Sequence, residues 1–127
     1  QALQPQGVEF IAVDIHADDD PEAALLAACD EHTRLLAISS VHYASGLRLD
    51  LARLAQGCRD RGILICVDAI QSLGAAAMDV QALGLDFVIA DGHKWLLGPE
   101  GMALFYCRPE LRERLTLHQF GWFMVEH

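Results

Sequence analysis

A carboxylate and an amine on two separate stretches of this sequence are the side chains best suited to chemistry on a carbonyl group. The carboxylate is Asp68, followed by Gln71, and the amine is Lys94, which follows His93 in a glycine-containing stretch, 92–101. A lysine that loses its proton attacks carbonyl carbons, and burial or a neighbouring positive charge lowers its pKa enough to permit this. A carboxylate that contacts a ring nitrogen keeps that nitrogen protonated. The combination therefore suits an aldehyde cofactor with a nitrogen-containing ring.

Each of these side chains also has an ordinary explanation when it is taken alone. An aspartate such as Asp68 is most often a helix N-cap, and a lysine such as Lys94 is usually exposed. A lone histidine is more often a satisfied, partly buried imidazole than a catalyst. Together, a carboxylate and a lysine at two strand ends, with glycines keeping the backbone slim between them, predict a cofactor cleft. Pyridoxal 5'-phosphate is the usual aldehyde partner, because its protonated ring acts as an electron sink.

Alternating strands and helices are expected to position these residues. Apolar runs predict the strands, and helical spacing with capping signals such as Asp20-Pro21 predicts the helices. Strands are expected at 8–13, 34–41, 63–67, 85–90 and 102–106, and helices at 22–32, 47–58 and 109–117. This order favours parallel pairing with right-handed crossovers, and hence an α/β fold, a three-layer sandwich around a mostly parallel sheet. Ligands bind at the carboxyl ends of such strands, so Asp68 and the stretch 91–94 are expected at one edge.

Composition argues against several classes of function. With 127 residues, of which 53% are hydrophobic and 21% charged, the chain can build one ordinary core and is not expected to be disordered. Nine basic and eighteen acidic residues give a net charge of −9, which argues against binding to nucleic acid or to an anionic membrane. The apolar stretches fall far below the roughly 20 residues that a membrane-spanning helix needs.

Cysteine and histidine spacing indicates neither a metal site nor a redox site. The four cysteines form no C-x-x-C pair and each lies in an apolar run, which is typical of reduced, buried thiols in a cytoplasmic protein. The six histidines lack the i, i+4 spacing of a helical metal face, so no metal is expected. Cys107 is interpreted as a structural residue at a strand end.

The stretches 68–74, 92–95 and 98–101 closely resemble the class V aminotransferase family, which includes cysteine desulfurases and selenocysteine lyases. The resemblance extends from about residue 34 to about residue 106, and Asp-x-x-Gln followed by His-Lys is its most specific part. It implies part of the large domain of a pyridoxal-phosphate-dependent enzyme of fold type I, acting on an amino acid. Relatives are homodimers, so a homodimer is expected of the full-length protein.

The same resemblance assigns roles to individual residues. It implies that Lys94 is the catalytic Schiff-base lysine, that Asp68 is the partner of the pyridinium nitrogen, and that Gln71 donates to the phenolic oxygen of the cofactor. It implies that His93 lies near the cofactor phosphate or shapes the approach of the lysine. Transamination, elimination, sulfur removal and epimerisation share these first steps, and the sequence leaves the choice among them open.

Two positions depart from the family pattern and are retained as candidate cofactor-binding residues. Asp91 stands where many relatives have a serine that binds the phosphate, and a carboxylate there repels a dianion unless it is paired or turned away. Tyr43 stands where cysteine desulfurases often place an asparagine that touches the substrate and the cofactor. Cysteine is therefore not fixed as the substrate.

The resemblance also predicts that residues 1–127 form a single partial domain, the central segment of the large domain. The N-terminal phosphate-binding part and the C-terminal small domain of relatives are not among these residues. One alternative is a catalytically incomplete fragment or a cofactor-free scaffold. A dinucleotide-binding protein is a weaker alternative, because no G-x-G-x-x-G motif follows a strand. Phe120, Trp122 and Phe123 are expected either at a subunit contact or packed in another domain.

Overall fold

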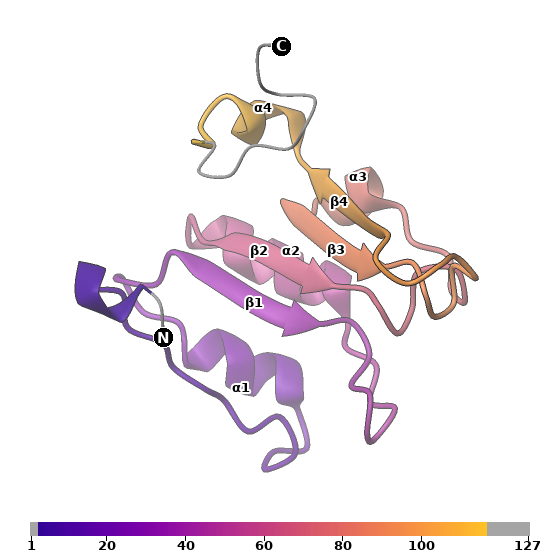
Figure 1. Cartoon of the computed structure of the whole chain (residues 1–127). Helices are drawn as coiled ribbons and strands as arrows, with labels where there is room; N and C mark the ends of the chain where they lie inside the picture. The colour runs from indigo at the N-terminus through magenta and orange to yellow at the C-terminus, as the bar shows by residue number, and fades with distance from the viewer. Residues whose placement is uncertain (1–2, 117–127) are drawn as a thin grey trace.

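One four-stranded sheet organises the structure, a computed structural model that describes residues 3–116 (Figure 1). In chain order the elements are a 3-10 helix η1 (Gln4–Gln6), α1 (Pro21–Ala27), β1 (Leu35–Ser39), α2 (Leu51–Asp60), β2 (Leu64–Asp68), α3 (Val80–Leu83), β3 (Phe87–Asp91), β4 (Ala103–Cys107) and α4 (Pro109–Arg112). The alternation of helix and strand that the sequence predicts is therefore present from α1 to β3.

The strands lie in the order β1-β2-β3-β4, and the first three run parallel. β4 runs antiparallel to β3, with Asp91 opposite Ala103, and its arrow points the other way in Figure 1. The reason is the connection: helices cross over between the parallel strands, whereas residues 92–102 form a loop that returns the chain directly. The prediction of an α/β fold with a mostly parallel sheet is confirmed.

Aspartates begin three of the helices. Asp20 and Asp50 accept backbone N–H groups in the first turns of α1 and α2, and Asp79 does the same for α3. A buried carboxylate then joins two of these helices, because Oε1 of Glu22 in α1 accepts the N–H of Asp50 at 2.6 Å. An ion pair between Arg53 and Asp20, 2.8 Å apart, adds a second link between α1 and α2.

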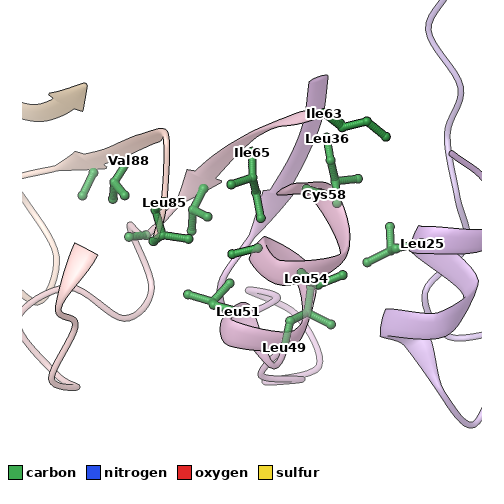
Figure 2. Packing of buried hydrophobic residues seen from close by; sticks show 14 residues of the cluster. Leu25, Leu36, Leu49, Leu51, Leu54, Cys58, Ile63, Ile65, Leu85 and Val88 are labelled. Atoms are coloured by element: carbon green, nitrogen blue, oxygen red, sulfur yellow. The ribbon is translucent and has the colours of Figure 1, made fainter. Parts of the chain in front are cut away.

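The hydrophobic core lies between the sheet and helices α1 and α2, and Figure 2 shows its side chains. Both layers contribute to it: Leu25, Leu36, Leu49, Leu51, Leu54, Cys58, Ile63, Ile65, Val67, Leu85, Val88 and Ala90 are buried. The buried positions of α2 recur at helical spacing, and Leu54 and Cys58, one turn apart, are completely buried. The strands contribute alternate residues, since successive strand side chains point to opposite faces.

The opposite face of the sheet is much more exposed and largely apolar. The strand register places Ser39, Asp68, Ile89 and Phe105 in one row across it. Leu35, Ile89 and Phe105 are 49%, 42% and 63% exposed. Residues 3–116 thus form the sheet and the helical layer on one side of it.

Several element boundaries differ from the sequence prediction. The strand expected at 8–13 is wrong: this segment is irregular and mostly exposed, because an apolar run becomes a strand only when another strand pairs with it. The helix expected at 22–32 ends at Ala27, and Asp30 then turns the chain by accepting the N–H groups of His32 and Thr33.

The other two helices also differ. α2 begins at Leu51 instead of residue 47, because Val41 and Arg48 pair in an antiparallel bridge and Asp50 is the cap. α4 ends at Arg112. Residue 117, the end predicted for that helix, and the aromatic group 120–123 lie outside the described residues.

Candidate functional site

Asp68 is the last residue of β2 and is half-buried at the carboxyl edge of the sheet. Its Oδ1 accepts the N–H of Ile70 at 3.0 Å, so the carboxylate is held by the turn that follows it and not by a helix N-terminus. Within residues 3–116 no partner is found for Oδ2. One oxygen therefore fixes the group, and among the described residues nothing stops the other from accepting a hydrogen bond from a ligand.

The turn after Asp68, residues 69–76, is fixed by two buried serines. Oγ of Ser40, just beyond β1, lies 2.7 Å from Oγ of Ser72, and both residues are buried. The N–H of Ser40 donates to the carbonyl of Asp68 at 2.9 Å, and the N–H of Ala69 donates to the carbonyl of Ile89 at 2.8 Å. Gln71 is half-buried in this anchored turn. Sequence reasoning missed the serine pair, because nothing local relates two serines so far apart in the chain.

Lys94 lies in a compact turn after β3. The N–H of Gly92 donates to the carbonyl of Met102 at 2.7 Å, and the N–H of Gly98 returns to the carbonyl of Gly92 at 2.8 Å. Leu97 donates to the carbonyl of Lys94 at 3.0 Å and has a φ of 55°, which is unusual for a residue with a Cβ. These bonds close the segment 92–102 and hold the half-buried Lys94 at a fixed place in it.

The two turns touch each other at Gly74. This residue has a φ of 95°, and a Cβ built on it would lie 2.5 Å from the carbonyl oxygen of Trp95. A side chain has no room there, so the backbone after Asp68 rests directly on the backbone after Lys94. The expectation that both turns lie at one edge of the sheet agrees with this contact and with the parallel pairing of β2 and β3.

The remaining candidates differ in their surroundings. Nδ1 of His93 lies 3.9 Å from Oδ2 of Asp91, the last residue of β3, so the unusual carboxylate faces a histidine. Tyr43 lies in the loop after β1, is 79% exposed, and its ring lies 5.3 Å from that of His42. The structure thus brings the turn after Asp68 into contact with the turn of His93 and Lys94 at Gly74, whereas Tyr43 lies in a separate and exposed loop.

The described residues form hollows away from Asp68 and Lys94. One, of 620 Å³, lies between α3 and β4 and is lined mainly by apolar residues such as Val88, Leu104 and Tyr106. A second, of 380 Å³, lies beneath the turn of Ser72, beside the start of α2. Neither is lined by Asp68 or Lys94, so the site is assigned on the chemistry of its side chains and not on the shape of a pocket.

The cysteines do not provide a reactive thiol at this edge. All four are free, and Cys58 and Cys107 are buried. Burial raises the pKa of the Cys58 thiol to about 11, and burial together with the charge of Asp68 raises the pKa of Cys66. Among residues 3–116, no three His, Cys, Asp or Glu side chains are grouped so that they could hold a metal ion. No helix in that same range has both the length and the apolar character needed to cross a bilayer.

Comparison with known proteins places the chain among enzymes of one family. Residues 2–127 match the family model described as aminotransferase class-V. The chain is 39% identical over 94 residues to a probable cysteine desulfurase of Methanothermobacter thermautotrophicus, covering 74% of this chain and 24% of that protein. It is 36% identical over 104 residues to isopenicillin N epimerase of Amycolatopsis lactamdurans, covering 82% and 26%.

Solved structures agree with these matches. The apo structure of a cysteine desulfurase from Thermococcus onnurineus has a TM-score of 0.78 at 28% identity, over 94% of this chain and 29% of that one. The complex of the cystine C-S lyase C-DES with its product cysteine persulfide also has a TM-score of 0.78 at 28% identity, over 83% and 29%. The chain therefore spans about a quarter to three tenths of the length of these relatives.

Proposed function

Because this chain belongs to the class-V aminotransferase family, we propose that it carries the cofactor-binding lysine of an enzyme that uses pyridoxal 5'-phosphate to act on an amino acid. The observation that supports this most strongly is the contact at Gly74. It joins the turn that follows Asp68 to the turn that holds Lys94, at the carboxyl edge of parallel strands. This is the edge at which α/β folds bind ligands.

The side chains present at this edge suit the cofactor. Asp68 has an acceptor oxygen without a partner in the described residues, as a protonated ring nitrogen requires. Gln71 follows in the anchored turn and can donate to a phenolic oxygen. Lys94 has no carboxylate within ion-pair distance among residues 3–116, so its amine is not tied to a counter-charge. His93 can meet the phosphate.

When bound, pyridoxal phosphate supplies a protonated ring that accepts negative charge developing at the α-carbon of the substrate. Asp68 would hold the proton on the ring nitrogen of the bound cofactor. Nζ of Lys94 would hold the cofactor covalently and, when its amine is released, would take the proton from the α-carbon of the substrate. Lys94 itself is half-buried in the compact turn. These steps are common to the reactions that the names of the relatives describe.

The substrate is proposed only as an amino acid. The relatives include proteins named as cysteine desulfurases and as isopenicillin N epimerases, so membership of the family leaves the later steps open. Neither Cys58 nor Cys107 is placed to carry sulfur, because both are buried. Tyr43, in the exposed loop after β1, is open to a substrate.

The 127 residues are proposed to act as the central part of a larger domain, within a homodimeric enzyme. The support is the apolar and exposed face of the sheet, on which Leu35, Ile89 and Phe105 offer a surface that a further layer would bury. The share of the relatives that the chain spans points the same way. A catalytically incomplete fragment or a cofactor-free scaffold is the competing proposal, and the same exposed face favours it for the isolated chain.

The sequence offers a sharp test, because Lys94 is the only lysine in it. In the natural protein, incubation with pyridoxal phosphate and reduction with borohydride should add one phosphopyridoxyl group to the peptide that contains Lys94, because imine formation releases water and borohydride then reduces the imine to a stable amine. Lys94→Ala should abolish both this label and the absorbance of the covalent adduct. Lys94→Arg serves as the control that keeps the charge without a primary amine. A natural protein in which the label lies outside this peptide, or in which the adduct survives Lys94→Ala, would refute the assignment.

The same experiment on the isolated 127-residue chain separates the two proposals. Stoichiometric labelling of Lys94 in this chain would contradict the cofactor-free scaffold. Labelling of the natural protein but not of the isolated chain would show that residues outside 1–127 complete the site.

A further inference from the structure

The pairing of Asp91 with His93 has no place in the proposed function so far. Oδ2 of Asp91 lies 3.9 Å from Nδ1 of His93, and the two side chains are 55% and 36% exposed. The contact is an ion pair when the imidazole is protonated, and even a neutral ring with its proton on Nδ1 points its positive end toward the carboxylate. At 3.9 Å the contact is electrostatic and not a hydrogen bond, and it joins the carboxylate to Nδ1 of the ring.

The backbone around the pair holds this arrangement in place. Asp91 is in register with Ala103 of β4, and the next residue, Gly92, donates its N–H to the carbonyl of Met102 at 2.7 Å. A Cβ on Gly92 would lie 3.0 Å from that same carbonyl oxygen, so the turn packs closely against the start of β4. Asp91 and His93 thus project from a braced segment whose next residue is Lys94.

Building on the proposed function, we propose that Asp91 is a positioning residue for His93. Its carboxylate engages Nδ1, so that Nε2 is the ring nitrogen left to meet the phosphate of the cofactor. A bare carboxylate at this place would repel a phosphate dianion. A carboxylate that faces the imidazole is instead turned toward the ring, and when the ring is protonated its Nε2–H can donate to the phosphate and offset the repulsion.

A double-mutant cycle in the natural protein tests this role. The measured quantity is the affinity for pyridoxal phosphate divided by the affinity for pyridoxal, each determined from the absorbance of the covalent adduct. Because both aldehydes react with the same lysine, this ratio reports the contribution of the phosphate group alone. With His93 present, Asp91→Asn should lower the ratio by about two- to fivefold, as expected for a partly exposed charge pair. In a His93→Ala background, the same change should raise the ratio, since only the repulsion is left to remove.

A second measurement does not depend on the cofactor. In the cofactor-free protein at pH 8, the ring nitrogen shifts of His93 in an NMR spectrum should show the proton mainly on Nδ1, and Asp91→Asn should move it toward Nε2. A carboxylate that only braces the turn would leave these shifts unchanged.

The outcomes separate the two proposals. A ratio that rises with Asp91→Asn in both backgrounds, or that changes in neither, overturns the positioning role while leaving the assignment of Lys94 intact. If neither aldehyde forms an adduct on Lys94, the proposed function fails and this inference fails with it.

Discussion

Gly74→Ala is the substitution that most directly tests how the two turns of the site are held together. The change has two costs. The first is backbone strain: at a φ of 95° a side chain costs roughly 1–3 kcal/mol. The second is the clash: the new Cβ would lie 2.5 Å from the carbonyl oxygen of Trp95 and 2.7 Å from its carbonyl carbon, and forcing a group into a filled space typically costs about 1–3 kcal/mol more.

Gly62→Ala is the matched control for this experiment. Gly62 follows α2, has a φ of 69°, and a Cβ built on it meets nothing within 4 Å. It therefore carries the strain of a positive φ without the clash. Urea unfolding of the two variants should differ by about 1–3 kcal/mol in the free energy of unfolding, with Gly74→Ala the less stable.

The clash should also weaken the binding of the cofactor. Relief of the contact separates the turn after Asp68 from the turn of Lys94, and the bound cofactor must bring them together again. A contact of 1–3 kcal/mol then appears as a loss of affinity of roughly 5- to 150-fold, measured as adduct formation on Lys94. Gly62→Ala should leave the affinity unchanged. Equal stability of the two variants, with equal affinity for the cofactor, would refute the reasoning.

Three further predictions concern stability and thiol reactivity. Asp86→Ala removes a buried carboxylate that accepts the N–H of Ile65 at 2.9 Å. Urea unfolding should show a free energy of unfolding that is lower by about 2 kcal/mol, and a decrease below about 0.5 kcal/mol would contradict a stabilising role for this carboxylate. A hydrogen bond from Arg53 lowers the pKa of Asp20, so the ionised carboxylate stabilises the fold above the ordinary aspartate pKa near 4, and this stabilisation is lost as the pH falls below that value. In Asp20→Asn, the free energy of unfolding should therefore decline less steeply between about pH 5 and pH 2. An unchanged slope would argue against the pair of Asp20 and Arg53. Burial raises the pKa of Cys58 to about 11, so iodoacetamide at pH 8 should label this residue only after unfolding. Peptide mass mapping measures the labelling, and rapid labelling of Cys58 in the native protein would disprove its burial.

The sequence predicted the sheet well where each strand is defined by its own residues. The runs at 63–67, 85–90 and 102–106 became β2, β3 and β4 with shifts of one or two residues. The segment 8–13 has a similar apolar pattern and formed no strand. The difference is that a strand depends on a neighbour to complete its hydrogen bonds, and a local pattern contains no information about whether that neighbour is present.

The site shows the same division. Identity and order in the sequence were enough to single out Asp68 and Lys94 and to expect them at one edge, because parallel strands share the edge at which they end. The pairing of Ser40 with Ser72 and the contact of Gly74 with Trp95 could not be predicted. Each joins positions that are far apart in the chain and are brought together only by the packing of the sheet.

What the sequence by itself determined is the chemistry available and the class of fold, since both follow from residue types and from short-range periodicity. The tertiary structure decided which face of the sheet is buried, how the two turns rest against each other, and that Asp91 faces His93. These are matters of distance between atoms, and a distance of a few ångströms depends on the register of the strands and the exact path of the turns, which no single stretch of the sequence specifies.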